Sequence, residues 1–194
     1  MKRICVFCGS SSGARPEYTE AAVTIGTEIV RRGLELVYGG GRIGLMGVVA
    51  DTVLAAGGRA IGVIPKALMT KEIAHSGLTE LHVVESMHER KAMMADRTDA
   101  FIALPGGFGT MEEFFEVLTW AQLGLHRKPC ALLNTAGYYD GLLALFETFL
   151  GERFVLPEHR TLVLDDTDPL RLLDRIERYT HPSVETWLTD DDET

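Results

Sequence analysis

The sequence is poor in cysteine and has no long apolar run. Three cysteines among 194 residues are an odd number, so a disulfide framework is not indicated. No segment has the length and apolarity of a transmembrane helix. The apolar part of residues 1–7 is too short for a signal peptide, and a Gly/Ser-rich loop follows at 9–13. We therefore expect a cytoplasmic protein without a membrane partner.

The sequence also lacks an excess of positive charge. It carries 19 Lys and Arg against 28 Asp and Glu, and this net charge of −9 argues against a general nucleic-acid-binding surface. Its length and its 46% hydrophobic content suit one globular domain, expected at residues 1–180. Residues 181–194, which include Asp190 to Glu193, are expected to form an acidic tail.

Common cofactor and metal signatures are missing as well. No G-x-x-x-x-G-K-[ST] phosphate loop is present, which argues against a P-loop kinase or ATPase. Cys5-x-x-Cys8 has no second cysteine pair, and six scattered histidines lack metal-ligand spacing. We expect both cysteines to fill the core and the strand end, and we expect neither a metal ion nor a cofactor.

The sequence does contain short apolar runs that alternate with amphipathic segments. The apolar runs predict seven strands, at residues 3–8, 34–38, 59–64, 81–84, 100–104, 130–133 and 162–164. The other segments predict helices at residues 17–32, 46–56, 87–98, 114–122, 142–150 and 169–179. This order is typical of an α/β fold, a Rossmann-like doubly wound parallel sheet of about seven strands with helices on both faces.

Three glycine-rich loops follow three of the predicted strands, at residues 9–13, 39–44 and 106–109. Because ligands of such sheets bind beyond the carboxyl ends of the strands, we expect these loops to meet at one edge. The loop at 39–44 also matches G-x-G-x-x-G, but no acidic residue ends the next predicted strand, at 59–64. A mononucleotide site is therefore favoured over a dinucleotide site.

The stretch from Pro105 to Glu113 joins a buried strand to a helix. Its three glycines let backbone N–H groups crowd together at a helix N-terminus, where they attract anions. We interpret the stretch as a phosphate cradle with a carboxylate, Glu113, one turn inside it. Alternatively, Thr110 and Glu113 form a capping box in which the carboxylate only bonds the backbone.

Met87-His88-Glu89-Arg90-Lys91 opens the predicted helix before this stretch. The guanidinium of Arg90 offers a planar fork of donors for phosphate or carboxylate, and Lys91 offers a point charge. Because the segment follows a strand end next to the cradle, we favour a binding role for Arg90 over a solvated helix face. For Lys91 both interpretations stay open.

Four motifs together point to one family. They are Cys8-Gly9-Ser10-Ser11, G-G-G-x-x-G-L-M-G at 39–47, M-x-x-R-K at 87–91 and P-G-G-x-G-T-x-x-E at 105–113. They resemble the Lonely guy family of cytokinin riboside 5′-monophosphate phosphoribohydrolases, from the first strand to about Gln122. Such chains are often labelled lysine decarboxylases, but no lysine here stands out as a Schiff-base site for pyridoxal phosphate.

The resemblance implies hydrolysis of the N-glycosidic bond of AMP or an N6-substituted AMP, to a free base and ribose 5-phosphate. It assigns catalysis to Arg90 and Glu113. The candidate substrate and phosphate contacts are Glu72, Met87, Lys91, Gly106, Gly107, Phe108, Gly109, Thr110, Thr119, Gly40 and Gly41. The alternative is a nucleotide-sensing or ligand-carrying module of the same fold, which the presence of both catalytic residues disfavours.

The helix predicted after the cradle is apolar on most sides. One stripe, which includes Phe114 and Val117, can cover the sheet, whereas Phe115 and Trp120 fall outside it. We expect a second copy of the chain to cover those aromatics in a homodimer close to the pocket, as the resemblance also suggests. The alternative is that the helix at 142–150 covers them within one chain.

Overall fold

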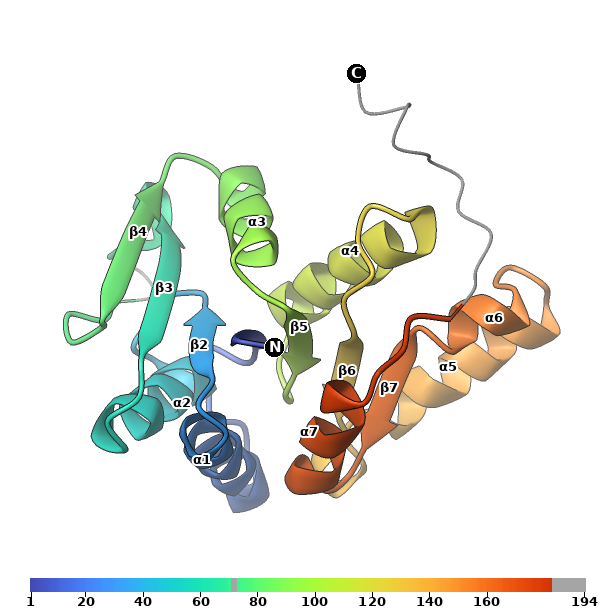
Figure 1. Cartoon of the computed structure of the whole chain (residues 1–194), viewed down its shortest axis with the longest axis horizontal. Helices are drawn as coiled ribbons and strands as arrows, with labels where there is room; N and C mark the ends of the chain where they lie inside the picture. Colours follow the sequence, from blue (N-terminus) through green and yellow to red (C-terminus); the bar gives the residue numbers. More distant parts are fainter. Residues whose placement is uncertain (71–72, 183–194) are drawn as a thin grey trace.

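A single parallel sheet forms the centre of the molecule (Figure 1). The computed structural model of the protein describes residues 1–70 and 73–182. Its seven strands lie in the order β4-β3-β2-β1-β5-β6-β7. They are β1 (Arg3–Phe7), β2 (Glu35–Tyr38), β3 (Ala60–Pro65), β4 (Glu80–Val84), β5 (Ala100–Ala103), β6 (Cys130–Leu133) and β7 (Val163–Asp166). The predicted doubly wound parallel sheet is confirmed, and the strand order reverses between β1 and β5.

Helices cover both faces of the sheet, with α1, α2 and α7 on one side and α3 and α4 on the other (Figure 1). The helices are α1 (Pro16–Arg31), α2 (Gly44–Ala55), α3 (Met87–Asp96), α4 (Phe108–Leu123), α5 (Asp140–Gly151), α6 (Pro157–Arg160) and α7 (Pro169–Glu177). Two short 3-10 helices are η1 (Lys66–Leu68) and η2 (Thr135–Gly137). The four-residue α6 was not predicted. None of the described helices combines the length and apolarity needed to cross a bilayer.

The side chains of each strand alternate between two hydrophobic cores, one on each face of the sheet. In β1, Ile4 and Val6 pack in the core beneath α1 and α2, whereas Cys5 and Phe7 pack in the core beneath α3 and α4. Cys8 belongs to the first core, at the strand end. Both cysteines are buried free thiols, as expected.

Helix α4 begins at Phe108, six residues before the predicted start at 114. Its N-cap is Gly107, so Thr110 lies inside the first turn and Glu113 in the second. The capping-box interpretation is therefore wrong, since it requires Thr110 at the N-cap position. Phe108, Gly109 and Thr110 have low helix propensity. They are tolerated in the first turn, because the amides there form no intrahelical hydrogen bond that a poor helix former could weaken.

The three glycine-rich loops meet at the point where the strand order reverses. The Gly9 amide donates to the Pro105 carbonyl at 3.1 Å, and the Leu45 amide donates to the Gly9 carbonyl at 3.0 Å. Gly44 has a φ of +57°, and a Cβ there would lie 2.3 Å from the carbonyl carbon of Ser10. Only glycine allows this approach of one backbone to another. The expected gathering of the loops at one sheet edge is confirmed.

Helix α5 covers part of the apolar surface of α4 within the same chain. The Phe115 ring packs edge-on against Phe146, with 6.0 Å between the ring centroids. Trp120 packs against the same core and is half-buried. Coverage within one chain therefore accounts for Phe115, and this aromatic no longer argues for a second copy.

Candidate active site

A cavity of about 340 Å³ opens beyond the carboxyl ends of β1 and β5. Of the predicted site residues, it brings together Met87, Arg90, Glu113 and the four residues from Gly107 to Thr110. Five other residues that line it were not predicted as site residues: Cys8, Ser10, Met46, Leu68 and Glu112. Cys8, Ser10 and Met46 stand in the quoted motifs, which is a signal that could have identified them. Leu68, in η1, has no such signal.

Arg90 is buried beside the cavity, with 4% of its surface exposed. Its helix is fixed at the N-terminus by Ser86, whose hydroxyl accepts from the Glu89 amide at 3.1 Å. The Nη2 of Arg90 donates to the Gly39 carbonyl at 3.2 Å and lies 3.7 Å from Oε1 of Glu113. One guanidinium thus links the loop after β2, helix α3 and helix α4.

Gly39 makes room for this guanidinium. A Cβ at position 39 would lie 1.9 Å from Nη2 of Arg90, which is far closer than atoms in contact approach. Glycine at position 39 therefore leaves the space that the Arg90 guanidinium occupies. Gly40 and Gly41 instead contact the segment after η1. The Gly40 carbonyl accepts a hydrogen bond from the backbone amide of His75 at 3.0 Å, and Gly41 forms an isolated antiparallel β-bridge with Ala74. These two predicted contacts do not line the cavity.

The N-terminus of α4 supplies backbone donors beside the buried acid. Phe108, Gly109 and Thr110 form its first turn, where amides have no intrahelical acceptor, and all three line the cavity. Glu113, 9% exposed, follows Thr110 by three residues on the same helix face. The Cα of Glu113 therefore lies about 4.5 Å along the axis from that of Thr110, and the carboxylate shares the cavity with the anion-attracting amides.

Cys8 forms an apolar wall of the cavity. Burial, together with the nearby charge of Glu113, raises the pKa of the Cys8 thiol well above its usual range. The same two causes raise the pKa of Cys5. Because the thiolate is the reactive form, neither cysteine is set up as a nucleophile. Among residues 1–70 and 73–182, no group of three or more His, Cys, Asp or Glu side chains is placed to hold a metal ion.

Lys91 does not line the cavity, and its side chain reaches α4. Its ammonium forms ion pairs with Glu112 and, at 3.0 Å, with Glu116. Burial alone would lower the pKa of Lys91, but the hydrogen bonds to these two carboxylates raise it, so the ammonium stays charged. In this structure Lys91 clamps α3 to α4.

Two further predicted contacts, Thr119 and Gly106, lie elsewhere. Thr119 is exposed on α4, where its hydroxyl donates to the Phe115 carbonyl at 2.7 Å. It lines a separate cavity of about 130 Å³ between α4, α5 and α6. Gly106 lines a neighbouring cavity on the other side of the cradle. Glu72 lies outside the described residues.

Comparisons with known proteins agree on the family. A family model described as "possible lysine decarboxylase" matches residues 46–176. A probable cytokinin riboside 5′-monophosphate phosphoribohydrolase of Oryza sativa subsp. japonica is 53% identical over 183 residues, which cover 94% of this chain and 82% of the relative. An Arabidopsis thaliana cytokinin riboside 5′-monophosphate phosphoribohydrolase is 52% identical over 178 residues, which cover 92% of this chain and 82% of the relative. The chain belongs to the Lonely guy family.

Solved structures show the same fold at much lower identity. The molybdenum cofactor carrier protein of Chlamydomonas reinhardtii matches this Lonely guy chain with a TM-score of 0.70 and 20% identity, over 91% of this chain and 96% of that one. At that identity the likeness concerns the fold alone. The lysine decarboxylase description has no support in the site, since no lysine is found among the described residues that line the cavity.

The clamp formed by Lys91 generates a prediction. Replacing Lys91 by Met leaves Glu116 without its buried partner, so unfolding in urea should show a stability loss of about 1–3 kcal/mol. Glu112→Gln is the matched control: because its side chain is 52% exposed, its loss should stay below about 1 kcal/mol. A Lys91→Met protein of parental stability with a raised KM would contradict the clamp and favour direct substrate contact.

Proposed function

We propose that this protein hydrolyses the N-glycosidic bond of a nucleoside 5′-monophosphate, AMP or an N6-substituted AMP, to free base and ribose 5-phosphate. The observation that carries the proposal is the buried pair of Arg90 and Glu113, 3.7 Å apart, in one cavity with the N-terminus of α4. Two relatives that share about half of their aligned residues with this chain are named for the same type of reaction, which supports the proposal.

Each part of the cavity has a role in this reaction. The amides of the first turn of α4 bind the 5′-phosphate, because they and the helix dipole both favour an anion. Departure of the base builds positive charge on the ribose, as in glycoside hydrolysis. The carboxylate of Glu113 stabilises that charge and orients or deprotonates the attacking water. Arg90 holds Glu113 in place and adds a positive charge to the phosphate side.

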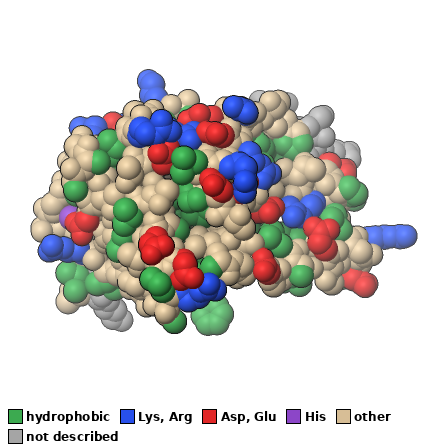
Figure 2. All heavy atoms as spheres, turned by 90° about the horizontal axis from the view of Figure 1, so that it is seen from below, with side chains coloured by type: hydrophobic (Ala, Val, Ile, Leu, Met, Phe, Trp, Pro, Cys, Tyr) green, Lys and Arg blue, Asp and Glu red, His purple; other side chains and the backbone are tan. Residues whose placement is uncertain are grey.

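The proposed setting of the enzyme is the cytoplasm, with small nucleotides as its partners. Three buried free thiols suit a reducing compartment. The face shown in Figure 2 mixes acidic and basic side chains, and a net charge of −9 does not favour nucleic acid or an anionic membrane. Attraction of an anionic substrate is therefore left to the local donors of the cavity.

Replacement of Glu113 tests its catalytic role. Glu113→Gln keeps the shape of the side chain but removes its charge, and we expect turnover of AMP to fall roughly 10²–10⁴-fold while the protein stays folded. Glu147→Gln provides the control, since Glu147 is an exposed glutamate on α5 that does not line the cavity, and it should change turnover less than about threefold. Near-parental turnover of a folded Glu113→Gln protein would contradict the proposal.

The phosphate requirement tests the cradle. Adenosine lacks the charge-assisted hydrogen bonds of AMP, so its kcat/KM for release of free adenine should be lower by about 10²-fold or more. Chromatographic detection of adenine measures both substrates in parallel. Equal rates would exclude the cradle, and tight binding of AMP without any release of adenine would favour the non-catalytic, ligand-carrying alternative.

We also propose that the protein is a homodimer with α4 in the interface. Leu118 and Trp120 on this helix are only half-buried, and Thr119 is exposed. The resemblance assigns Thr119 to the substrate, yet Thr119 does not line the cavity of its own chain. A two-fold contact through α4 would cover the apolar surface and could bring Thr119 to the cavity of the other copy.

Light scattering at micromolar concentration tests the dimer. We expect a mass near twice 21.4 kDa for the parent, and a shift toward one chain mass for Trp120→Glu, which places a charge in the interface. Val23→Glu is the control, because Val23 is 42% exposed on α1, on the other side of the sheet, and should leave the mass unchanged. A parental mass near 21.4 kDa would refute the dimer.

A further inference from the structure

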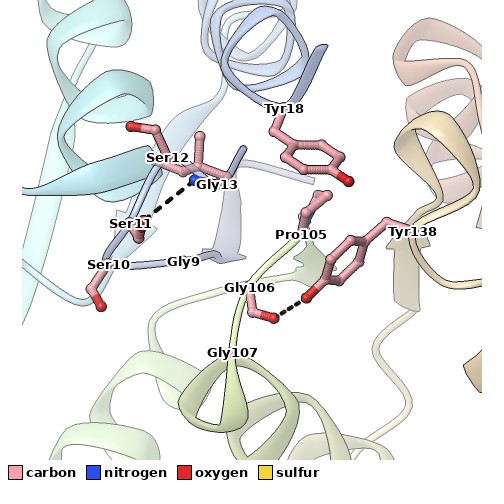
Figure 3. A pocket seen from close by; sticks show the side chains of 11 residues that line it. Gly9, Ser10, Ser11, Ser12, Gly13, Tyr18, Pro105, Gly106, Gly107 and Tyr138 are labelled. Atoms are coloured by element: carbon pink, nitrogen blue, oxygen red, sulfur yellow. Dashed lines mark hydrogen bonds between the residues drawn. The ribbon is translucent and has the colours of Figure 1, made fainter. Parts of the chain in front are cut away.

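A second cavity, of about 300 Å³, lies against the back of the phosphate cradle. The loop at 9–13, Tyr18, Tyr138 and the turn from Pro105 to Gly107 line it (Figure 3). In this cavity the Tyr138 hydroxyl points at the cradle and donates a hydrogen bond to the Gly106 carbonyl (Figure 3). Tyr138 stands 32 residues after Gly106 in the sequence, directly after η2. The mechanism above gives it no role.

Tyr138 completes a set of three donors that hold the consecutive carbonyls of residues 104–106, where the cradle begins. The buried Tyr139 hydroxyl donates to the Leu104 carbonyl at 2.6 Å. The Gly9 amide donates to the Pro105 carbonyl at 3.1 Å. Tyr138 takes the third, on Gly106. Every carbonyl from 104 to 106 is therefore held by a donor outside the turn, and none of these partners belongs to the catalytic cavity described above.

The orientation of the peptide between Gly106 and Gly107 follows from the third of these bonds. The peptide is trans, so its C=O and its N–H point in opposite directions. With the carbonyl held toward Tyr138, the Gly107 amide points away from this tyrosine, and Gly107, which lines both cavities, can present it to the catalytic one. The reversed peptide would present a carbonyl oxygen to the substrate phosphate, and two negative groups repel each other.

This peptide needs an external support more than its neighbours do. Glycine flanks it on both sides, and glycine restricts backbone rotation least. A side chain cannot be added at Gly106, because a Cβ there would lie 2.1 Å from Oγ1 of Thr110. The tyrosine ring is itself fixed by edge-on packing, with centroids 5.0 Å from Tyr139 and 5.6 Å from Tyr18.

We propose that Tyr138 is a positioning residue for phosphate recognition, which holds the Gly106–Gly107 peptide so that the Gly107 amide donates to the 5′-phosphate. The inference rests on the proposed function, because it requires the phosphate to bind at the N-terminus of α4. Under this proposal, specificity for phosphorylated substrates depends on Tyr138 behind the cradle as well as on the residues that line the catalytic cavity.

Tyr138→Phe tests this role, since it keeps the packed ring and removes only the donor. We expect the dissociation constants of ribose 5-phosphate and of AMP, measured by calorimetry on the whole chain, to rise about three- to tenfold, as for loss of one hydrogen bond. The KM for AMP should rise by the same factor with kcat within about twofold, because the contact is the same in ground and transition states. Binding of adenosine should not change.

Two further variants separate positioning from general damage. Tyr18→Phe removes a hydroxyl from the same cavity that makes no bond to the cradle, and it should leave phosphate binding unchanged. Tyr139→Phe removes the buried bond to Leu104 and should lower the midpoint of thermal unfolding, which Tyr138→Phe should leave near the parental value.

Parental affinity for ribose 5-phosphate in Tyr138→Phe would overturn the proposal, as would an equal loss in Tyr18→Phe or an equal loss of adenosine binding. The binding measurements distinguish this result from failure of the proposed function. A parent that binds ribose 5-phosphate and AMP without cleaving AMP would refute the hydrolysis while still testing Tyr138. A parent that binds neither would overturn both.

Discussion

The close approach of three backbone loops at the carboxyl ends of β1, β2 and β5 is the constraint on which the rest of the structure depends. The Gly9 amide bonds the Pro105 carbonyl, and Gly44 lies against the backbone of Ser10. Any side chain at position 44 would separate these loops. The reversal of strand order places β1 beside β5, and the glycines then allow the loop ends to close into a single site.

This closure explains how an arginine and a glutamate are kept buried together. Removing two charges from water is costly, and the attraction between them offsets that cost only when other polar groups also bond them. The Gly39 carbonyl provides such a bond for Arg90 at 3.2 Å. A Cβ at position 39 would block it, so the glycine loop after β2 and the charged pair depend on each other. In this surrounding of low polarity a fixed charge acts more strongly on a developing positive centre than it would in water.

Local patterns in the sequence predicted the parts of the structure that local physics determines. Short apolar runs predict strands buried on both faces, and each of the seven predicted runs forms a strand of the parallel sheet. The spacing of Gly106, Gly107 and Gly109 before Glu113 predicts amides and a carboxylate at one helix start. The helix itself begins six residues earlier than apolar periodicity indicated, because its first turn is made of cavity-lining residues and not of core residues.

Contacts between distant segments could not be predicted in this way. Lys91 is bound by Glu112 and Glu116, which come from the next helix, and a basic residue beside Arg90 in the sequence gives no sign of that. Tyr138 reaches Gly106 across 32 residues, and nothing near Tyr138 in the sequence has phosphate-binding character. Both depend on how α3, η2 and α4 pack, which is a property of the folded chain.

The same distinction shows where function is encoded in this fold. A molybdenum cofactor carrier shares the architecture at a TM-score of 0.70 but only 20% of its residues, so the sheet and its helices do not by themselves select a reaction. The reaction is determined by a few side chains at the sheet edge and by the backbone groups that these side chains orient. Glu113 and Arg90 supply charge, and Gly39 and Gly44 supply space. Because a glycine peptide has two accessible orientations, the donor that fixes it becomes as much a part of phosphate recognition as the amide that touches the phosphate.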